Sequence, residues 1–491
     1  MSSHGSAMKR LTTGSTAFDR ILDGGIPIRS LNMIAGSPGA GKTLFSLQML
    51  FALARQGKKG LYLTTLSEPS LKLVQYMQQF SFFDAARMER EIVFADLGAA
   101  IRKGAEATLH EITSRVEREE PAILVIDSFK AIRDVIGDAV ASRSFVYDLA
   151  VHTASWGATT LLVGEYTEAE SAKHAEFAIA DGIIRLSNSR RELTAIREVE
   201  VLKLRGTRYV TGCHFYEIGS DGLDFFPRVR APDDIATEPA AHVERPVSTR
   251  QRASTGVTGL DAMLGGGIPR SSTTILQGGT GTGKTLMGLQ FLLEGARHGE
   301  PGIHFMLEET PDQLRGFAQS LGWDLPALEE RGLITLSYIS PVELSTDRFL
   351  DRARREVEQV GARRAVLDSL TSLALGVPSD RRFKELVYAV SKHFHALGIT
   401  LNMNMEVADL LGSAQLSGHG VSFAADNVIQ LKFVEIDGRL ERGLSVLKAR
   451  GVRHATDVRR LSVERDGVQV GAVFEGLRGV LTGLPVPSRE S

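Results

Sequence analysis

The sequence predicts an α/β fold made of two tandem units, each with a mainly parallel sheet flanked by helices. Two glycine-rich motifs lie about 242 residues apart, and repetition at such a distance indicates a duplicated structural unit. After each motif, a stretch with the apolar periodicity of a helix leads into a short β-rich run. This alternation is typical of a parallel sheet covered by helices.

Both copies open with a threonine-glycine pair, an aspartate and a Gly-Gly-Ile-Pro run. These are Thr13, Gly14, Asp19 and Gly24–Pro27 in the first copy, and Thr255, Gly256, Asp261 and Gly266–Pro269 in the second. The periodicity then predicts helices Leu44–Arg55 and Leu286–Arg297 and strands Gly60–Thr65 and Gly302–Leu307. Further strands are expected in pairs at Ile123–Ile126 and Ala365–Leu367, Thr160–Val163 and Thr400–Met403, and Ile183–Leu186 and Val428–Leu431. The two halves therefore give the same order of elements.

A boundary is expected where proline, alanine and charged residues replace the apolar periodicity, in Pro227–Arg252. We expect domains at residues 9–230 and 253–464, joined by a linker at 231–252. Residues 1–8 are expected to form a disordered leader, and the tail at 465–491 to be loosely ordered because it is rich in glycine and proline.

Composition excludes several classes of protein. The net charge of −2 and pI of 6.7 provide no overall basic field for nucleic acid or an anionic membrane. Cys213 is the only cysteine, so the chain forms no intramolecular disulfide and no cysteine-based zinc cluster. No run of about 18 apolar residues is present. We therefore expect a soluble, cytoplasmic protein.

The two glycine-rich motifs fit G-x-x-x-x-G-K-[ST], the pattern of a phosphate-binding loop. They consist of Gly36, Ser37, Pro38, Gly39, Ala40, Gly41, Lys42 and Thr43, and of Gly278, Gly279, Thr280, Gly281, Thr282, Gly283, Lys284 and Thr285. In such a loop the backbone N–H groups and the following helix N-terminus surround the phosphates, and the lysine meets the terminal ones. The final threonine would bind Mg²⁺. Each loop thus predicts a nucleotide site.

An NTPase also needs an acid for Mg²⁺, usually at the end of an apolar strand. Asp127 and Asp368 end such strands, and each is followed by a serine. An aspartate that caps the next helix is the simpler alternative. Because both copies place the acid at a similar distance from the loop, we favour metal binding.

Carboxylates for the incoming nucleophile are predicted beside the second loop. Glu308 and Glu309 follow a strand directly, and ligands of open α/β sheets bind at this edge. The corresponding stretch of the first half contains Ser67 and Glu68. An exposed acidic loop is the alternative interpretation. The difference predicts two sites with unequal rates or roles.

A further matched string places a lysine and an arginine late in each half, Lys203 with Arg205 and Lys448 with Arg450. On a strand, residues two apart point to the same face. A solvated edge explains one such pair. Two copies favour cationic fingers that enter a neighbouring subunit's site.

Together these motifs resemble the KaiC family, double-domain RecA-like ATPases whose best-known member is the cyanobacterial clock protein. The resemblance covers about residues 9 to 464. It implies a two-tiered homohexamer with ATP and Mg²⁺ between subunits. It also implies hydrolysis mainly in the first domain and phosphotransfer to a hydroxyl of the adjacent subunit in the second.

By resemblance, Glu308 and Glu309 match the paired acids that act as base in phosphotransfer, and Glu68 matches one acid of the first-domain pair. Lys203, Arg205, Lys448 and Arg450 match the cationic residues that act on the neighbouring subunit. Ser422 matches the phosphorylated serine, whereas Phe423 replaces the threonine beside it. A capping hydroxyl is the alternative for Ser422.

Three functions remain open at this point. The leading hypothesis is an ATP-hydrolysing, autophosphorylating signalling or timing switch, with possible signalling proteins as partners. A RecA-like nucleic-acid motor shares the core, but the neutral charge disfavours it. The third is a scaffold in which ATP mainly holds the ring together.

Overall fold

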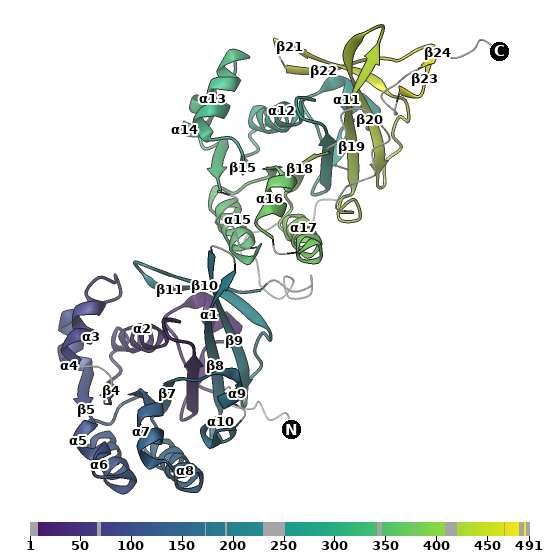
Figure 1. Cartoon of the computed structure of the whole chain (residues 1–491). Helices are drawn as coiled ribbons and strands as arrows, with labels where there is room; N and C mark the ends of the chain where they lie inside the picture. Colours follow the sequence, from purple (N-terminus) through teal and green to yellow (C-terminus); the bar gives the residue numbers. More distant parts are fainter. Residues whose placement is uncertain are drawn as a thin grey trace, which may run out of the picture. The chain divides into compact units, whose positions relative to one another are not determined.

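The computed structural model describes residues 8–65, 70–171, 173–191, 194–228, 251–340, 346–377, 379–407, 420–465, 467–480 and 486–487. The chain divides into two compact units, Met1–Arg228 and Val229–Ser491 (Figure 1). Each unit is an α/β structure in its own right, and the fold class predicted from the sequence is confirmed.

The first unit is built on a nine-stranded sheet. Its strands are β3 (Leu31–Gly36), β4 (Gly60–Thr64), β5 (Ile92–Asp96), β6 (Ile123–Asp127), β7 (Thr159–Glu165), β8 (Gly182–Arg191), β9 (Thr194–Leu204), β10 (Cys213–Gly219) and β11 (Gly222–Phe226). Their order is β11-β10-β9-β8-β3-β7-β6-β4-β5. The six strands from β8 to β5 are parallel neighbours, and β9, β10 and β11 extend the sheet with antiparallel pairing.

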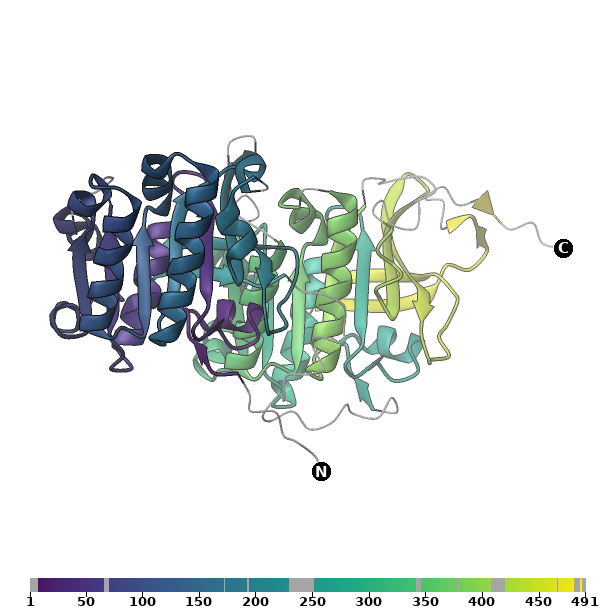
Figure 2. The ribbon, with the colours of Figure 1, turned by 90° about the horizontal axis from the view of Figure 1, so that it is seen from below.

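Helices cover both faces of this sheet (Figures 1 and 2). They are α1 (Thr16–Ile21), α2 (Lys42–Ala54), α3 (Ser70–Met77), α4 (Ala85–Glu91), α5 (Gly98–Ile101), α6 (Ala105–Glu119), α7 (Phe129–Ile136), α8 (Ala139–Ser155), α9 (Glu168–Ser171) and α10 (Ala175–Ile179). One apolar cluster joins α2 to the sheet face that carries Tyr62 and Val125, and another joins α7 and α8 to the opposite face. Strands buried on both faces read as continuous apolar runs, as in β6.

The second unit repeats this plan. Its sheet consists of β14 (Thr273–Gly278), β15 (Gly302–Met306), β16 (Ile334–Tyr338), β17 (Arg364–Asp368), β18 (Thr400–Glu406), β19 (Asn427–Ile436), β20 (Arg439–Ala449), β21 (Arg459–Glu464) and β22 (Gly467–Val473). The order is β16-β15-β17-β18-β14-β19-β20-β21-β22, which is the first unit's arrangement read from its other edge. The repeat inferred from the sequence thus extends through the whole sheet.

Helices again lie on both faces of the sheet. They are α11 (Thr258–Met263), α12 (Lys284–Arg297), α13 (Pro311–Ser320), α14 (Leu325–Glu330), α15 (Thr346–Val360), α16 (Leu370–Leu375) and α17 (Asp380–Ala396). Short strand pairs complete the chain: β1 (Arg10–Leu11) with β2 (Ile26–Pro27), β12 (Arg252–Ala253) with β13 (Ile268–Pro269), and β23 (Leu477–Arg478) with β24 (Val486–Pro487). The α12 face and the α15–α17 face hold separate apolar clusters.

The matched opening motif has a structural role. Asp19 accepts hydrogen bonds from the backbone N–H and hydroxyl of Thr13 at 2.8 and 2.7 Å, and Asp261 does the same for Thr255 at 2.9 and 2.6 Å. Gly14 has a φ of +84°, and a Cβ there would lie 3.1 Å from a backbone oxygen of α2. The motif therefore fastens the first turn of each unit against the helix that follows the loop.

One expectation about the tail is wrong. Strand β22 lies beyond Glu464, in the stretch expected to be loosely ordered, and pairs antiparallel with β21. Val468 gives the reason, because its side chain is buried and its N–H donates to Gln290 Oε1 at 2.8 Å. The expected leader lies outside the described residues except for Met8, as does most of the expected linker.

Candidate nucleotide sites

Both phosphate-binding loops lie at the carboxyl edge of the parallel strands, between β3 and α2 and between β14 and α12 (Figure 1). Gly39, Gly41, Gly281 and Gly283 have φ angles of +71°, +85°, +75° and +106°. These left-handed conformations suit glycine because it has no Cβ. Each loop leads into a helix of 13 or 14 residues, whose N-terminal amides and dipole favour an anion.

The two loop lysines are buried against loop carbonyls. Lys42 Nζ donates to Ser37 O at 2.8 Å, and Lys284 Nζ donates to Gly278 O and Gly279 O, each at 2.8 Å. Burial lowers the pKa of both ammonium groups, and nearby carboxylates oppose the shift. Both ammonium groups therefore already lie at the loop backbone, where the motif places the terminal phosphates.

In the first unit, Asp127 is fixed by two hydroxyl groups. Thr43 Oγ1 and Tyr62 Oη each donate to Asp127 Oδ2 at 2.7 Å. A threonine hydroxyl and a carboxylate are oxygen ligands of the kind that Mg²⁺ takes beside substrate phosphates. The donor set at this position fits that ion.

The helix-cap explanation for the two aspartates is wrong. Ser128 and Ser369, the residues that follow them, are the N-caps of α7 and α16. Both Asp–Ser peptide bonds are cis. The carboxylates of Asp127 and Asp368 remain at the ends of their strands, on the side of the loops.

The second unit forms a small cavity beside Asp368. It is lined by Thr285, His304, Met306, Glu308, Glu309 and Asp368. His304 is fully buried, and its Nε2 lies 3.9 Å from Asp368 Oδ2. Burial lowers the pKa of the imidazole, which Asp368 partly opposes, so the ring is neutral at pH 7. The structure thus brings the predicted threonine, aspartate and glutamates together, and adds a histidine.

The two glutamates of this cavity have different surroundings. Glu308 Oε1 accepts a hydrogen bond from Ser369 Oγ at 2.6 Å and another from Ser372 Oγ. The side chain of Glu309 is exposed, but its pKa is raised. The main cause is partial loss of water around its carboxyl, and repulsion from Asp368 and Glu308 adds to the effect. A raised pKa makes Glu309 a better proton acceptor than an ordinary glutamate.

The first-unit counterparts, Ser67 and Glu68, lie outside the described residues. The strand register nevertheless aligns the two halves just before these residues. Thr64 pairs with Asp127 as Met306 pairs with Asp368, so Thr64 and Met306 are equivalent positions. Counted onward without an insertion, Leu66 and Ser67 take the two glutamate positions, and Pro69 matches Pro311. On this count Glu68 falls at the position of Thr310, one residue beyond the acid pair.

The lysine and arginine of each late string bind within their own unit. Lys203 Nζ donates to Ala178 O at 3.0 Å, and Arg205 lies 3.6 Å from Asp181. In the second unit, Arg450 lies 3.8 Å from Asp426. In both units the string therefore lies at the edge of the sheet where β8 or β19 begins, beside the aspartate that precedes that strand.

Ser422 lies on this edge in the second unit. Lys448 Nζ donates to Ser422 O at 2.9 Å and to Ala425 O at 2.7 Å. Ser422 is half-buried, whereas Phe423 is exposed and stacks on Tyr388 with 6.2 Å between ring centroids. The candidate acceptor and one candidate finger thus share a single surface of the unit.

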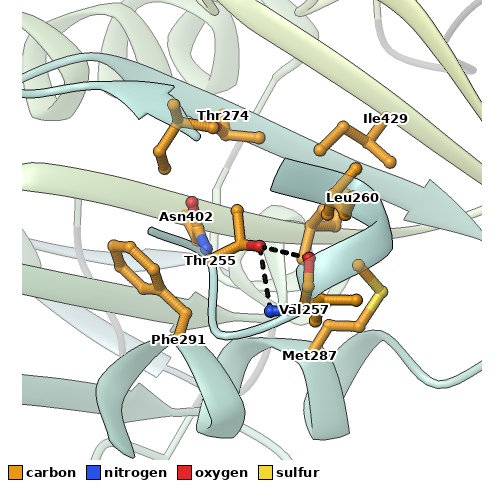
Figure 3. A pocket seen from close by; sticks show the side chains of 10 residues that line it. Thr255, Val257, Leu260, Thr274, Met287, Phe291, Asn402 and Ile429 are labelled. Atoms are coloured by element: carbon orange, nitrogen blue, oxygen red, sulfur yellow. Dashed lines mark hydrogen bonds between the residues drawn. The ribbon is translucent and has the colours of Figure 1, made fainter. Parts of the chain in front are cut away.

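A second cavity of this unit is part of the apolar core. Figure 3 shows its lining, which includes Leu260, Met287, Phe291 and Ile429. One of its two threonines, Thr255, is already bonded to the backbone of Val257. With no charged residue in its lining, this cavity is not a phosphate site.

The fold and the two loops define the class first: an ATPase with two repeated RecA-like units. A profile of the KaiC ATPase family matches residues 11–230 and 253–473. The chain belongs to this family, and membership implies that it binds ATP.

Relatives match along nearly the whole chain. The circadian clock protein KaiC3 of Synechocystis sp. is 29% identical over 99% of this chain and 96% of its own length. The circadian clock oscillator protein KaiC 1 of the same organism is 28% identical over 97% of this chain and 92% of its length. The oscillator protein KaiC of Parathermosynechococcus lividus is 29% identical over 96% and 87%, respectively.

Sequence reasoning missed Tyr62, His304 and Asn404, which surround the two strand-end aspartates. Tyr62 and His304 lie inside apolar strands and look like core residues when read alone, whereas Asn404 lies in β18, where polar and apolar residues alternate. A position-by-position comparison of the two halves would have singled out Tyr62 and His304, because they occupy the same register position beside β6 and β17.

Within the described residues, no helix is both long and apolar enough to cross a membrane.

Proposed function

We propose that this KaiC-family ATPase works as a homohexameric signalling or timing switch that hydrolyses ATP and phosphorylates itself on Ser422. The observation that carries the proposal is the asymmetry of the two sites. The cavity beside Lys284 and Asp368 contains two glutamates. In the first unit, counting along the sequence from Thr64, which is equivalent to Met306, puts Leu66 and Ser67 at those two positions.

The proposed phosphotransfer takes place between subunits. Ser422 Oγ attacks the γ-phosphorus of ATP in a neighbour's second site, a new O–P bond forms, and the bond to the β–γ bridging oxygen breaks to release ADP. The hydroxyl proton passes to the carboxylate of Glu309. Its raised pKa and its position in the cavity support this role. Glu308, held by two serine hydroxyls, would orient the attacking oxygen.

Cationic residues would stabilise the transferring phosphoryl group. Lys448 and Arg450 lie at the edge of the sheet that carries Ser422. If this edge faces the second site of a neighbouring subunit, both cations would therefore lie near that site together with the acceptor hydroxyl. Lys203 and Arg205 would serve the first site in the same way. Cations supplied by a neighbouring subunit stabilise the charge that develops in the transition state.

Magnesium would be held by Thr43 with Asp127 and by Thr285 with Asp368, where it would neutralise phosphate charge. In the first unit, Lys42 and the loop would bind ATP, and water is the proposed nucleophile. Glu68 remains a candidate for orienting that water, although the register favours Leu66 and Ser67 at the acid positions. Slow hydrolysis and ring assembly are therefore the roles proposed for this site.

Radiolabelled ATP tests the acceptor. Wild type and Ser422→Thr, which keeps a hydroxyl, should become labelled in the presence of Mg²⁺. Ser422→Ala should not become labelled, while its oligomer size and ATP hydrolysis in the first unit are retained. Equal labelling of the Ser422→Ala variant would contradict the assignment.

A scaffold with little turnover is the second candidate. The stacked pair Phe423 and Tyr388 favours it, because the aromatic ring takes the place of a second hydroxyl beside Ser422. Tight ATP binding, a nucleotide-dependent ring, and negligible hydrolysis and labelling would select the scaffold over the autokinase.

A further inference from the structure

The second nucleotide site contains a buried imidazole that no predicted role uses. His304 is fully buried in β15 and lines the cavity that contains Asp368 and Thr285. Neither of its ring nitrogens has a hydrogen-bond partner among the described residues. Buried polar groups without partners are rare in folded proteins, and each requires an explanation.

The first unit shows what a side chain at this position does. Tyr62 and His304 stand at equivalent positions, since Tyr62 pairs with Val125 of β6 and His304 with Val366 of β17. Tyr62 Oη donates to Asp127 Oδ2 at 2.7 Å. His304 Nε2 faces Asp368 Oδ2 from the same side, at 3.9 Å. In the first unit the carboxylate of Asp127 is therefore hydrogen-bonded to Tyr62. In the second unit His304 lies near the carboxylate of Asp368 but beyond hydrogen-bond distance.

A second polar side chain reinforces the contrast. Asn404 of β18 pairs with Asp368 in the sheet, and both of its side-chain polar atoms are buried without partners in the described part of the chain. The corresponding partner of Asp127 is Val163. Asp368 therefore lies between an imidazole and a carboxamide, whereas Asp127 lies between a bonded tyrosine and a valine.

We propose that His304 is a positioning residue for Asp368 in the second ATP site. In the loaded site its Nε2–H donates to Asp368 Oδ2, as Tyr62 Oη donates to Asp127 Oδ2, and so holds the carboxylate in place for the ion. A movement of about 1 Å brings the pair from 3.9 Å to hydrogen-bond distance. The inference rests on the proposed Mg²⁺–ATP site and adds how the second site orients its acid.

The consequence is a difference in magnesium dependence between the two sites. The carboxylate of the first site is oriented before the ion arrives, and that of the second becomes oriented as it is loaded. Partners that orient a metal-binding carboxylate typically change metal affinity by about 10- to 100-fold. Loss of the His304 N–H should therefore weaken the response to Mg²⁺ and leave metal-free nucleotide binding unchanged.

Equilibrium binding of methylanthraniloyl-labelled ATP to the full chain tests this inference. Lys42→Ala silences the first loop, so binding reports the second site, first in EDTA and then across a magnesium titration. In this background, His304→Leu should raise the half-saturating Mg²⁺ concentration by about tenfold or more, with the EDTA affinity unchanged. His304→Gln, which keeps an N–H near the position of Nε2, should recover most of the loss.

Tyr62→Phe in a Lys284→Ala background is the matched control, and should weaken the magnesium response of the first site. Equal magnesium curves for parent and His304→Leu would overturn the inference alone. So would equal losses in the leucine and glutamine variants, since that pattern indicates packing rather than an N–H. A Lys42→Ala parent that keeps the wild-type assembly size in size-exclusion chromatography but binds no nucleotide would overturn the proposed second ATP site as well. Thermal melting checks that each variant is folded.

Discussion

Replacing Asn404 with valine should stabilise the second unit. Asn404 is fully buried, and neither its Oδ1 nor its Nδ2 has a partner among the described residues. The equivalent position of the first unit is Val163, which pairs with the strand-end aspartate in the same register. Valine is therefore compatible with this place in the sheet, and its two methyl groups fill a volume close to that of the carboxamide.

The magnitude follows from the cost of an unsatisfied polar group. A buried donor or acceptor without a partner costs about 1–3 kcal/mol, so the substitution should raise the free energy of unfolding by about 1–2 kcal/mol. For a unit of roughly this size, 1 kcal/mol changes the melting temperature by about 2–4 °C. The melting transition of the second unit should thus rise by about 2–8 °C in the absence of nucleotide.

Differential scanning calorimetry measures this shift, and Asn427→Val is the matched control. Asn427 is equally buried, but its Nδ2 donates to Ser272 Oγ and Thr274 Oγ1, each at 3.0 Å. Removing these bonds should lower the free energy of unfolding by about 1–3 kcal/mol. If both valine variants melt at similarly lower temperatures, the reasoning about Asn404 is refuted.

Three further predictions concern the nucleotide sites and the elements beside them. Lys42→Ala and Lys284→Ala should each abolish ATP binding at one site, so that the double variant binds none and runs as a smaller assembly in size-exclusion chromatography. The raised pKa of Glu309 means that its carboxylate is protonated, and inactive as a base, at a higher pH than an ordinary glutamate. Initial rates of Ser422 labelling should therefore fall as the pH decreases through that pKa, and Glu309→Gln should remove this acid limb together with most of the rate. Thr310→Ala, which breaks the capping box at the start of α13, should lower the free energy of unfolding by about 1 kcal/mol in a denaturant titration.

The parts of the fold that repeat were predictable from the sequence. Both loops, the helices after them and the parallel strands recur in the two halves, and each strand predicted there is present. The antiparallel extension was harder to see because its edge strands mix charged and apolar residues. Strand β22 lies in a stretch whose glycines suggested disorder, yet Val468 packs into the core of the unit.

The sites were predictable to the extent that a motif defines them. Thr43 and Asp127 meet as expected, because the loop and the strand end share one edge of the sheet. Tyr62 and His304 were not predicted, since their role depends on which strand lies beside which. That order is decided by long-range pairing of β4 with β6 and of β15 with β17, and no local pattern contains it.

Mass spectrometry of the full chain after incubation with ATP and Mg²⁺ tests the central claim, that the two sites are unequal and that the second transfers phosphate to Ser422. We predict a single phosphate on the peptide that contains Ser422, absent in Lys284→Ala and strongly reduced in Glu309→Gln. Phosphate on residues of the first unit, or a modified Ser422 peptide in the Lys284→Ala variant, would contradict the account.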